Sequence, residues 1–140
     1  MHTLRAIKNG AVTQVLITSQ ADVVHARMRA RSLAIAADFE PAQVVVVAAA
    51  ISELARNIVL YARRGHIALE LVENGDLRGI RIVATDEGPG IAGLDRTTRP
   101  QSTGGGLGFG LRTVQHVMDE FQIDSSPATG TRVLVTKWRT

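Results

Sequence analysis

The stretch Glu53-Leu-Ala-Arg-Asn57 places a carboxylate and a carboxamide four positions apart. On a helix, positions i and i+4 share a face, so the two side chains would project together, with Tyr61 one turn further on. A carboxylate can accept a proton from a nucleophile, and a carboxamide oxygen can bind Mg²⁺. An ordinary helix with a solvated polar face has the same spacing, so this motif alone leaves both interpretations open.

A second motif, Thr85-Asp86-Glu87-Gly88-Pro89-Gly90-Ile91, directly follows an apolar stretch typical of a strand. The Asp86 carboxylate only accepts hydrogen bonds, so it could pair with an exocyclic amine such as that of adenine. Gly88 and Gly90 allow a tight turn against a ligand. A Gly-Pro-Gly turn without a ligand is the competing interpretation.

A third motif is rich in glycine and ends where a helix is expected to begin, at Ser102-Thr-Gly-Gly-Gly-Leu-Gly-Phe-Gly-Leu111. Glycines let backbone N–H groups approach an anion, and a helix N-terminus adds positive potential. The motif is therefore suited to binding a phosphate group through its backbone. The lysine of a Walker P-loop is absent, and the loop comes too late in the chain for a Rossmann fold. A flexible linker is the alternative.

These motifs must be positioned by regular elements, which we predict from hydrophobic periodicity and turn residues. Ser19 is the expected N-cap of the first helix. Val44 to Val47 favour a strand by propensity, but the apolar period of 3.6 continues through Val59 and favours a helix. The expected elements are a strand at 12–18, helices at 20–38 and 41–61, a hairpin of 66–73 and 77–85, a helix from Leu107 carrying Leu111, Val114, Val117, Met118 and Phe121, and strands at 121–124 and 132–138.

The order strand–helix–helix–strand–strand–loop–helix–strand–strand predicts a two-layer α/β fold with a mixed sheet. The loop from Asp86 to Gly110 holds eight of the thirteen glycines, and loops of this length are usually functional or disordered. We expect one domain over residues 1–140, because there is no internal repeat or linker.

Composition excludes several classes of function. The chain has no cysteine, its four histidines lack metal-ligand spacing, and a net charge of +3 is too small to indicate a nucleic-acid partner. Only five residues are aromatic, too few for a base-stacking face. The N-terminus lacks a secretory h-region, and the longest apolar run, Val44 to Ile51, is short of the ~20 residues that span a bilayer, so we expect a cytoplasmic protein without a membrane partner.

Taken together and in this order, the three motifs resemble the Bergerat, or GHKL, nucleotide-binding family, and Gly130-Thr131 is similar to the family's terminal threonine position. The resemblance implies a two-layer α/β sandwich whose mixed, mostly antiparallel sheet is covered on one face by helices. A chain of 140 residues most resembles the anti-sigma and switch-kinase group of serine/threonine kinases. Within that group, the stressosome kinases of the RsbT type share the stretches ISELARNIVLYA, TDEGPGI, STGGGLGFGL and VMDEFQIDS.

The same resemblance implies roles for individual residues. Glu53 would be the general base, Asn57 the Mg²⁺ ligand together with the ATP phosphates, and Asp86 the acceptor for the adenine amine. The other implied nucleotide-binding residues are Gly88, Gly90 and Ile91 beneath the base, Gly104, Gly105, Gly106, Leu107, Gly108, Phe109 and Gly110 around the phosphates, and Thr131 near the adenine. Residues 91–103 resemble the ATP lid, which we expect to order on ATP binding, with Arg96 or Arg99 near the γ-phosphate.

Membership of this group implies ATP and Mg²⁺ as cofactors and protein serine or threonine as the phosphate acceptor. The implied substrates are STAS-domain scaffold or antagonist proteins, and the kinase, once released from them, would bind and activate a PP2C-type phosphatase. The alternative is a nucleotide-gated binding module of the anti-sigma kind with little kinase activity.

Overall fold

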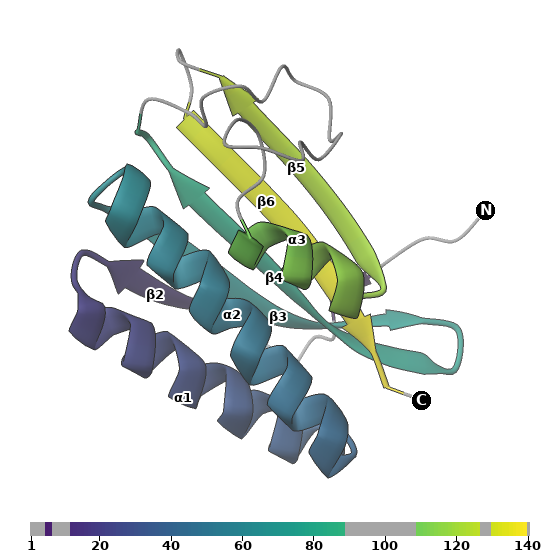
Figure 1. The fold of residues 1–140 in the computed structure, drawn as a ribbon. Coiled ribbons are helices and arrows are strands. Elements are labelled where there is room, and N and C mark those ends of the chain that lie inside the picture. Colours follow the sequence, from purple (N-terminus) through teal and green to yellow (C-terminus); the bar gives the residue numbers. More distant parts are fainter. Residues whose placement is uncertain (1–4, 7–11, 89–108, 127–129, 140) are drawn as a thin grey trace.

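A computed structural model describes residues 5–6, 12–88, 109–126 and 130–139 as a two-layer α/β fold (Figure 1). Three helices lie on one face of a six-stranded sheet in this part of the chain. In chain order the elements are β1 (Arg5–Ala6), β2 (Thr13–Ile17), α1 (Gln20–Ala36), α2 (Pro41–Tyr61), β3 (Gly65–Asn74), β4 (Leu77–Asp86), α3 (Phe109–Val117), β5 (Glu120–Ser126) and β6 (Gly130–Trp138).

The sheet has the order β1-β3-β4-β6-β5, and β2 also pairs with β3. Every pairing among the described strands is antiparallel. The β3–β4 hairpin runs in register from Gly65 opposite Asp86 to Asn74 opposite Leu77, and β4 pairs on its other side with β6, so that Asp86 lies opposite Thr131. The predicted two-layer architecture with a mostly antiparallel sheet is therefore confirmed, whereas the short β1 is not among the predicted strands.

The valine-rich segment at 44–47 is helical, as the apolar period predicts, and lies within α2. Pro41 occupies the first turn, and Glu40 and Gln43 form a reciprocal capping box. Burial of the periodic stripe against the sheet and α1 outweighs the β propensity of valine. The residues of α2 that are buried are Val44, Val47, Ala48, Ala50, Ile51, Ser52, Leu54, Ala55 and Ile58.

Helix α2 is long and apolar enough, by length and composition alone, to cross a membrane, although its longest uninterrupted apolar run is short. Its buried stripe accounts for that composition, because a helix that packs on a sheet and on a second helix needs apolar residues over much of its surface. The contacts of α2 in the structure are those of a core helix.

The ends of α1 differ from the prediction. The helix stops at Ala36 rather than Asp38, because Asp38 adopts a left-handed φ of 64° and Phe39 donates its N–H back to the Ala34 carbonyl at 3.0 Å. Ser19 stands at the N-cap but makes no capping bond with its side chain. Asp22 reaches back instead and accepts the Thr18 N–H at 2.8 Å, and this hydrogen bond lowers the pKa of Asp22.

Helix α3 and the last two strands also shift at their boundaries. The described part of α3 begins at Phe109, and the predicted start at Leu107 lies outside the described residues. The helix ends at Val117, so Phe121, predicted as part of its apolar set, belongs to β5. Strands β5 and β6 extend beyond their predicted ranges because they pair with each other from Glu120 opposite Thr136 to Ser126 opposite Gly130, which covers all of β5 and all of β6 except Lys137 and Trp138.

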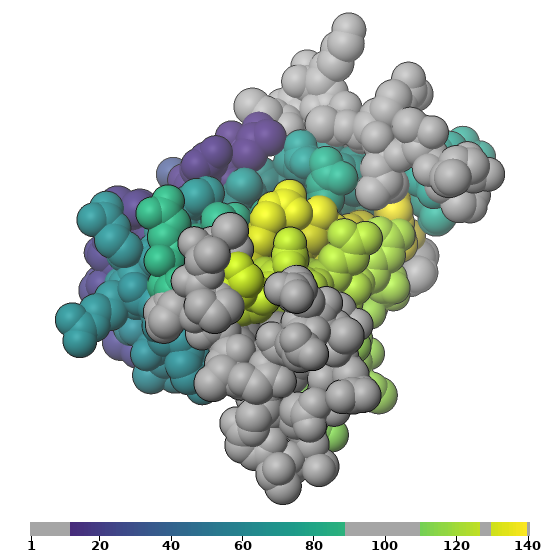
Figure 2. Space-filling view, turned by 90° about the horizontal axis from the view of Figure 1, so that it is seen from above, coloured from purple at the N-terminus to yellow at the C-terminus, as the bar shows by residue number. Residues whose placement is uncertain are grey.

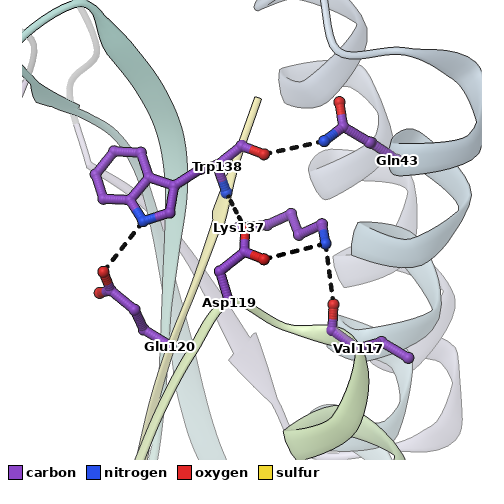
Figure 3. Close-up of polar contacts among 6 residues, drawn as sticks. All are labelled: Gln43, Val117, Asp119, Glu120, Lys137 and Trp138. Carbon is purple, nitrogen blue, oxygen red and sulfur yellow. Dashed lines mark hydrogen bonds and ion pairs between the residues drawn. The ribbon is translucent and has the colours of Figure 1, made fainter. Parts of the chain in front are cut away.

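One end of the sheet is tied to the helices by a group of polar contacts that we call the C-terminal clasp (Figure 3). Lys137 Nζ donates to the Val117 carbonyl at 3.1 Å, at the C-terminus of α3. Asp119 accepts the Trp138 N–H at 2.7 Å, and Gln43, in the first turn of α2, donates to the Trp138 carbonyl at 2.9 Å. The clasp consists of Gln43, Val117, Asp119, Glu120, Lys137 and Trp138.

Candidate functional site

A pocket lies where α2 and β4 finish and β6 begins. These ends of the elements lie toward the top of Figure 1, the side from which Figure 2 views the molecule. The pocket forms between the last two turns of α2, the start of α3 and the facing ends of β4 and β6. The structure thus brings together segments from four elements that are far apart in the sequence. Its lining residues are Leu54, Asn57, Ile58, Tyr61, Ala84, Asp86, Leu111, Thr131 and Val133.

Asp86 is the buried acidic residue of this pocket, with 8% of its surface exposed. Its Oδ1 accepts two backbone hydrogen bonds, from the Gly88 N–H at 2.9 Å and from the Thr131 N–H at 3.3 Å. Among the described residues, Oδ2 accepts none. Because a buried carboxylate is costly unless its lone pairs are used, the free oxygen is suited to an external donor.

The backbone around Asp86 is packed so closely that it tolerates little change. Gly130 has a φ of +83°, and a Cβ added there would lie 2.2 Å from the Asp86 carbonyl oxygen. A Cβ added at Gly88 would lie 2.6 Å from the Ala62 Cβ, just beyond α2. The described part of the predicted turn, from Asp86 to Gly88, is therefore tight. Its close packing against Ala62 fixes the position of the Asp86 carboxylate relative to α2. Gly90 and Ile91 lie outside the described residues.

Asn57 contributes a carboxamide to the pocket wall. Its Nδ2 is buried and has no hydrogen-bond partner in the described part of the chain. A buried unpaired polar group costs about 1–3 kcal/mol. Since rotation of the amide exchanges its oxygen and nitrogen, the same position can offer either a donor or an acceptor to a ligand. The unpaired amide indicates that the pocket is completed by something polar.

The hydroxyl of Thr131 forms a hydrogen bond with a residue that was not predicted as part of the site. Ser125, 1% exposed on the adjacent strand β5, lies with its Oγ 2.8 Å from Thr131 Oγ1. The two residues are directly opposite each other in the β5–β6 pairing. The sequence predicts strands at 121–124 and 132–138, and only the register of their pairing would have identified Ser125 as the neighbour of Thr131.

Glu53 lies beside the pocket and is not among its lining residues. Its carboxylate forms an ion pair with Arg56, one turn away on α2, and about a third of its side chain is exposed. A Cβ added at Gly110 in α3 would lie 2.3 Å from Glu53 Oε1. The structure therefore places Glu53 against the start of α3 and Asn57 in the pocket, although the two share a side of α2.

The glycine-rich motif is described only in part. Gly110 lies in the first turn of α3, against Glu53, and Phe109 begins that helix. The remaining predicted phosphate-binding residues lie outside the described residues, as does the predicted lid with its two arginines. They are Gly104, Gly105, Gly106, Leu107 and Gly108 in the loop, and Arg96 and Arg99 within 91–103.

The apolar walls of the pocket were also not predicted as site residues. Leu54 and Ile58 of α2 face Ala84 and Val133 of the sheet, with Leu111 of α3 at one side. Each is an ordinary core residue by its sequence pattern, so only the tertiary structure shows that these side chains border a pocket. Aliphatic walls, one carboxylate and one carboxamide are groups that can recognise a flat heterocycle that carries an amine.

Comparison with known proteins relates this chain to one family. A family model described as a histidine kinase-like ATPase domain matches residues 17–137, nearly the whole chain. The serine/threonine-protein kinase RsbT of Bacillus subtilis (strain 168) is 41% identical over 125 residues, which cover 89% of this chain and 94% of that protein. An anti-sigma F factor of Caldanaerobacter subterraneus subsp. tengcongensis is 31% identical over 114 residues, covering 75% of this chain and 78% of the relative.

Proposed function

This chain belongs to the family of histidine kinase-like ATPase domains, and from that premise we propose that it is an ATP-dependent protein serine/threonine kinase. The observation that carries the proposal is the buried Asp86, whose Oδ1 is taken by two backbone N–H groups while Oδ2 accepts no hydrogen bond from the described residues. Similarity to a relative named as a serine/threonine kinase supports the reaction class. We propose that residues 1–140 form one such domain and that it acts in the cytoplasm.

The adenine base would lie between the aliphatic walls of the pocket. Asp86 would accept its exocyclic amine through Oδ2, and Thr131 would lie beside the ring, with its hydroxyl oriented by Ser125. A carboxylate in this position selects adenine over guanine, because the guanine ring presents an oxygen acceptor where adenine presents an amine.

Asn57 would hold Mg²⁺ through its amide oxygen, together with the ATP phosphates. The buried amide without a partner fits this role, since a metal-bound phosphate would complete it. Among the described residues no group of three or more His, Asp or Glu side chains could hold a metal by themselves. When bound, Mg·ATP supplies the phosphoryl group and the metal charge that stabilises its transfer.

Glu53 would act as general base toward the acceptor hydroxyl. Its carboxylate is partly exposed, so that a protein substrate can reach it, and Arg56 limits its rotation. Because Gly110 has no side chain, the Glu53 carboxylate can lie against the first turn of α3, where the predicted phosphate-binding loop joins the helix. We propose that the loop residues 104–110 surround the phosphates with backbone N–H groups.

The proposed substrates are STAS-domain scaffold or antagonist proteins, and the proposed second partner is a PP2C-type phosphatase that the released kinase binds and activates. The resemblance to stressosome kinases and the similarity to RsbT support this assignment. The similarity to anti-sigma F factors keeps a second candidate open: a nucleotide-gated binding module with little kinase activity.

The experiment compares wild type with Glu53→Gln, using Mg·ATP and a STAS-domain protein from the same organism as acceptor. Glutamine keeps the size and the hydrogen-bonding capacity but cannot take the proton, so we expect unchanged ADP affinity and a transfer rate lowered by roughly 10²–10⁴-fold. Glu73→Gln, on β3 away from the pocket, is the matched control. Wild-type transfer by Glu53→Gln contradicts the role of the base, whereas partner binding without any transfer by wild type favours the binding module.

A further inference from the structure

A second hollow runs along the outer side of α2, between this helix and α3. Its lining residues are Val45, Val46, Ala49, Ala50, Glu53, Thr113, Val114 and Val117, and we call it the α2–α3 groove. The two alanines leave open space that larger side chains would fill, and Val45 at the far end is 67% exposed. Helices α2 and α3 lie next to each other on the same face of the sheet (Figure 1).

The groove and the pocket both take lining residues from α2 and α3. On α2 the groove takes residues from Val45 to Glu53, and the pocket takes residues from Leu54 to Tyr61. On α3 the pocket takes Leu111, and the groove takes the next two turns. Among the described residues none lines both hollows, and Glu53 of the groove is next in sequence to Leu54, the first pocket residue on α2.

The chemistry of the lining limits what can occupy the groove. Apart from Glu53 and Thr113, every lining side chain is aliphatic. Among its described lining residues there is no lysine or arginine, so this lining does not suit a phosphate or a nucleic acid. Val45 and Ala49 are exposed, and Val46 and Val117 are half-buried. Such a partly exposed aliphatic groove is suited to apolar side chains of another protein. The ionisable group at its inner end is the carboxylate that we assign as general base.

We propose that the α2–α3 groove receives the acceptor segment of the protein substrate, with the serine or threonine at Glu53 and small apolar residues along the rest. This inference rests on the proposed kinase function and adds the sequence preference of its substrate. The eight-residue step from Val45 to Glu53 is about 12 Å on a helix, which three or four extended residues span. The segment would therefore carry its apolar residues on one side of the acceptor.

Val45→Lys tests the groove at the end farthest from Glu53, with Val24→Lys as the matched control. Val24 is also an exposed helical valine, but it lies on α1, which lines neither hollow. The measurements are ADP affinity, and kcat and KM for phosphate transfer from Mg·ATP to the STAS-domain protein. We expect Val45→Lys to raise KM for that protein about tenfold, the effect of losing one buried valine contact, with kcat and ADP affinity unchanged.

Several outcomes overturn the inference. An unchanged KM in Val45→Lys, or an equal increase in Val24→Lys, means that the groove does not hold the substrate. If sedimentation shows that Val45→Lys dissociates a dimer of this chain while KM stays constant, the groove binds a second copy instead. If wild type transfers no phosphate, the proposed function fails separately, and titration of the STAS-domain protein into wild type and Val45→Lys still tests the groove, because equal affinities contradict it.

Discussion

The C-terminal clasp and the pocket treat their polar side chains in opposite ways. In the C-terminal clasp, the polar side chains bond to one another or to the backbone: Lys137 to Val117, Asp119 to Trp138, and Trp138 Nε1 to Glu120 at 3.1 Å. At the pocket end, the Asn57 amide is buried without a partner, and one oxygen of Asp86 accepts nothing from the described residues.

The difference has a physical meaning. A paired buried group contributes modestly to stability, whereas an unpaired one costs about 1–3 kcal/mol. A folded chain that keeps such groups in a pocket loses stability there unless a ligand completes their hydrogen bonds. We therefore expect substitutions at the pocket end to affect ligand binding more than folding, and substitutions in the clasp to do the reverse.

The largest expected effect comes from Asp86→Asn. The asparagine oxygen can still accept the N–H groups of Gly88 and Thr131, but its amide nitrogen would replace the free oxygen and repel the adenine amine. We expect ADP affinity, measured by titration calorimetry, to fall at least ~100-fold, with the free energy of unfolding lowered by no more than about 1 kcal/mol. Glu87→Gln removes the neighbouring exposed charge and is the control. Near-normal ADP binding by Asp86→Asn would show that Asp86 only fixes the turn.

Asn57→Ala should separate binding from folding most clearly. The substitution removes a buried donor that lacks a partner, so we expect the free energy of unfolding in urea to stay within about 1 kcal/mol of wild type or to rise. Mg²⁺ should no longer strengthen the binding of ADP, because its side-chain oxygen ligand is lost. Asn74→Ala, in the β3–β4 turn, is the control. Mg²⁺-dependent affinity that survives in the folded variant contradicts the assignment of Asn57.

Lys137→Met probes the opposite end. The lysine donates to the last carbonyl of α3 and lies within 3.4 Å of an Asp119 oxygen, so its loss should lower the free energy of unfolding by about 1–2 kcal/mol. ADP affinity should change less than threefold, and Lys137→Arg should retain most of the stability. A large loss of ADP affinity with normal stability would mean that the clasp positions α3 for ligand binding and that the two ends are not independent.

The smallest effect is expected at Asp22, in the first turn of α1, which belongs neither to the pocket lining nor to the clasp. Hydrogen bonds from Thr18 hold its pKa below the ordinary value of 3.8, so the carboxylate stabilises the fold above that pH and loses its effect as the pH falls through the native pKa. Asp22→Ala should therefore unfold slightly earlier in urea at pH 7, and the difference from wild type should shrink in acid. A constant difference down to pH 2 would show that the hydrogen bonds of Asp22 contribute nothing to stability.

The local elements and the kind of site could be predicted from the sequence. Alternation predicts the β3–β4 hairpin, a period of 3.6 predicts α2 despite its valines, and the positions of Asp86, Asn57 and Thr131 follow from motif order. These features are local, because each depends on residues within a few turns or one strand. Element ends were less predictable, as at Asp38, where the backbone turns left-handed after α1.

The tertiary structure alone decided which groups meet and which remain unpaired. The register of β5 with β6 places Ser125 against Thr131, and the register of β6 with β4 brings the Thr131 N–H to Asp86. The packing of α3 on α2 separates the pocket of Asn57 from the groove of Glu53, although the two residues are four positions apart. Such contacts depend on how whole elements pack, and no local pattern of residue types contains that information.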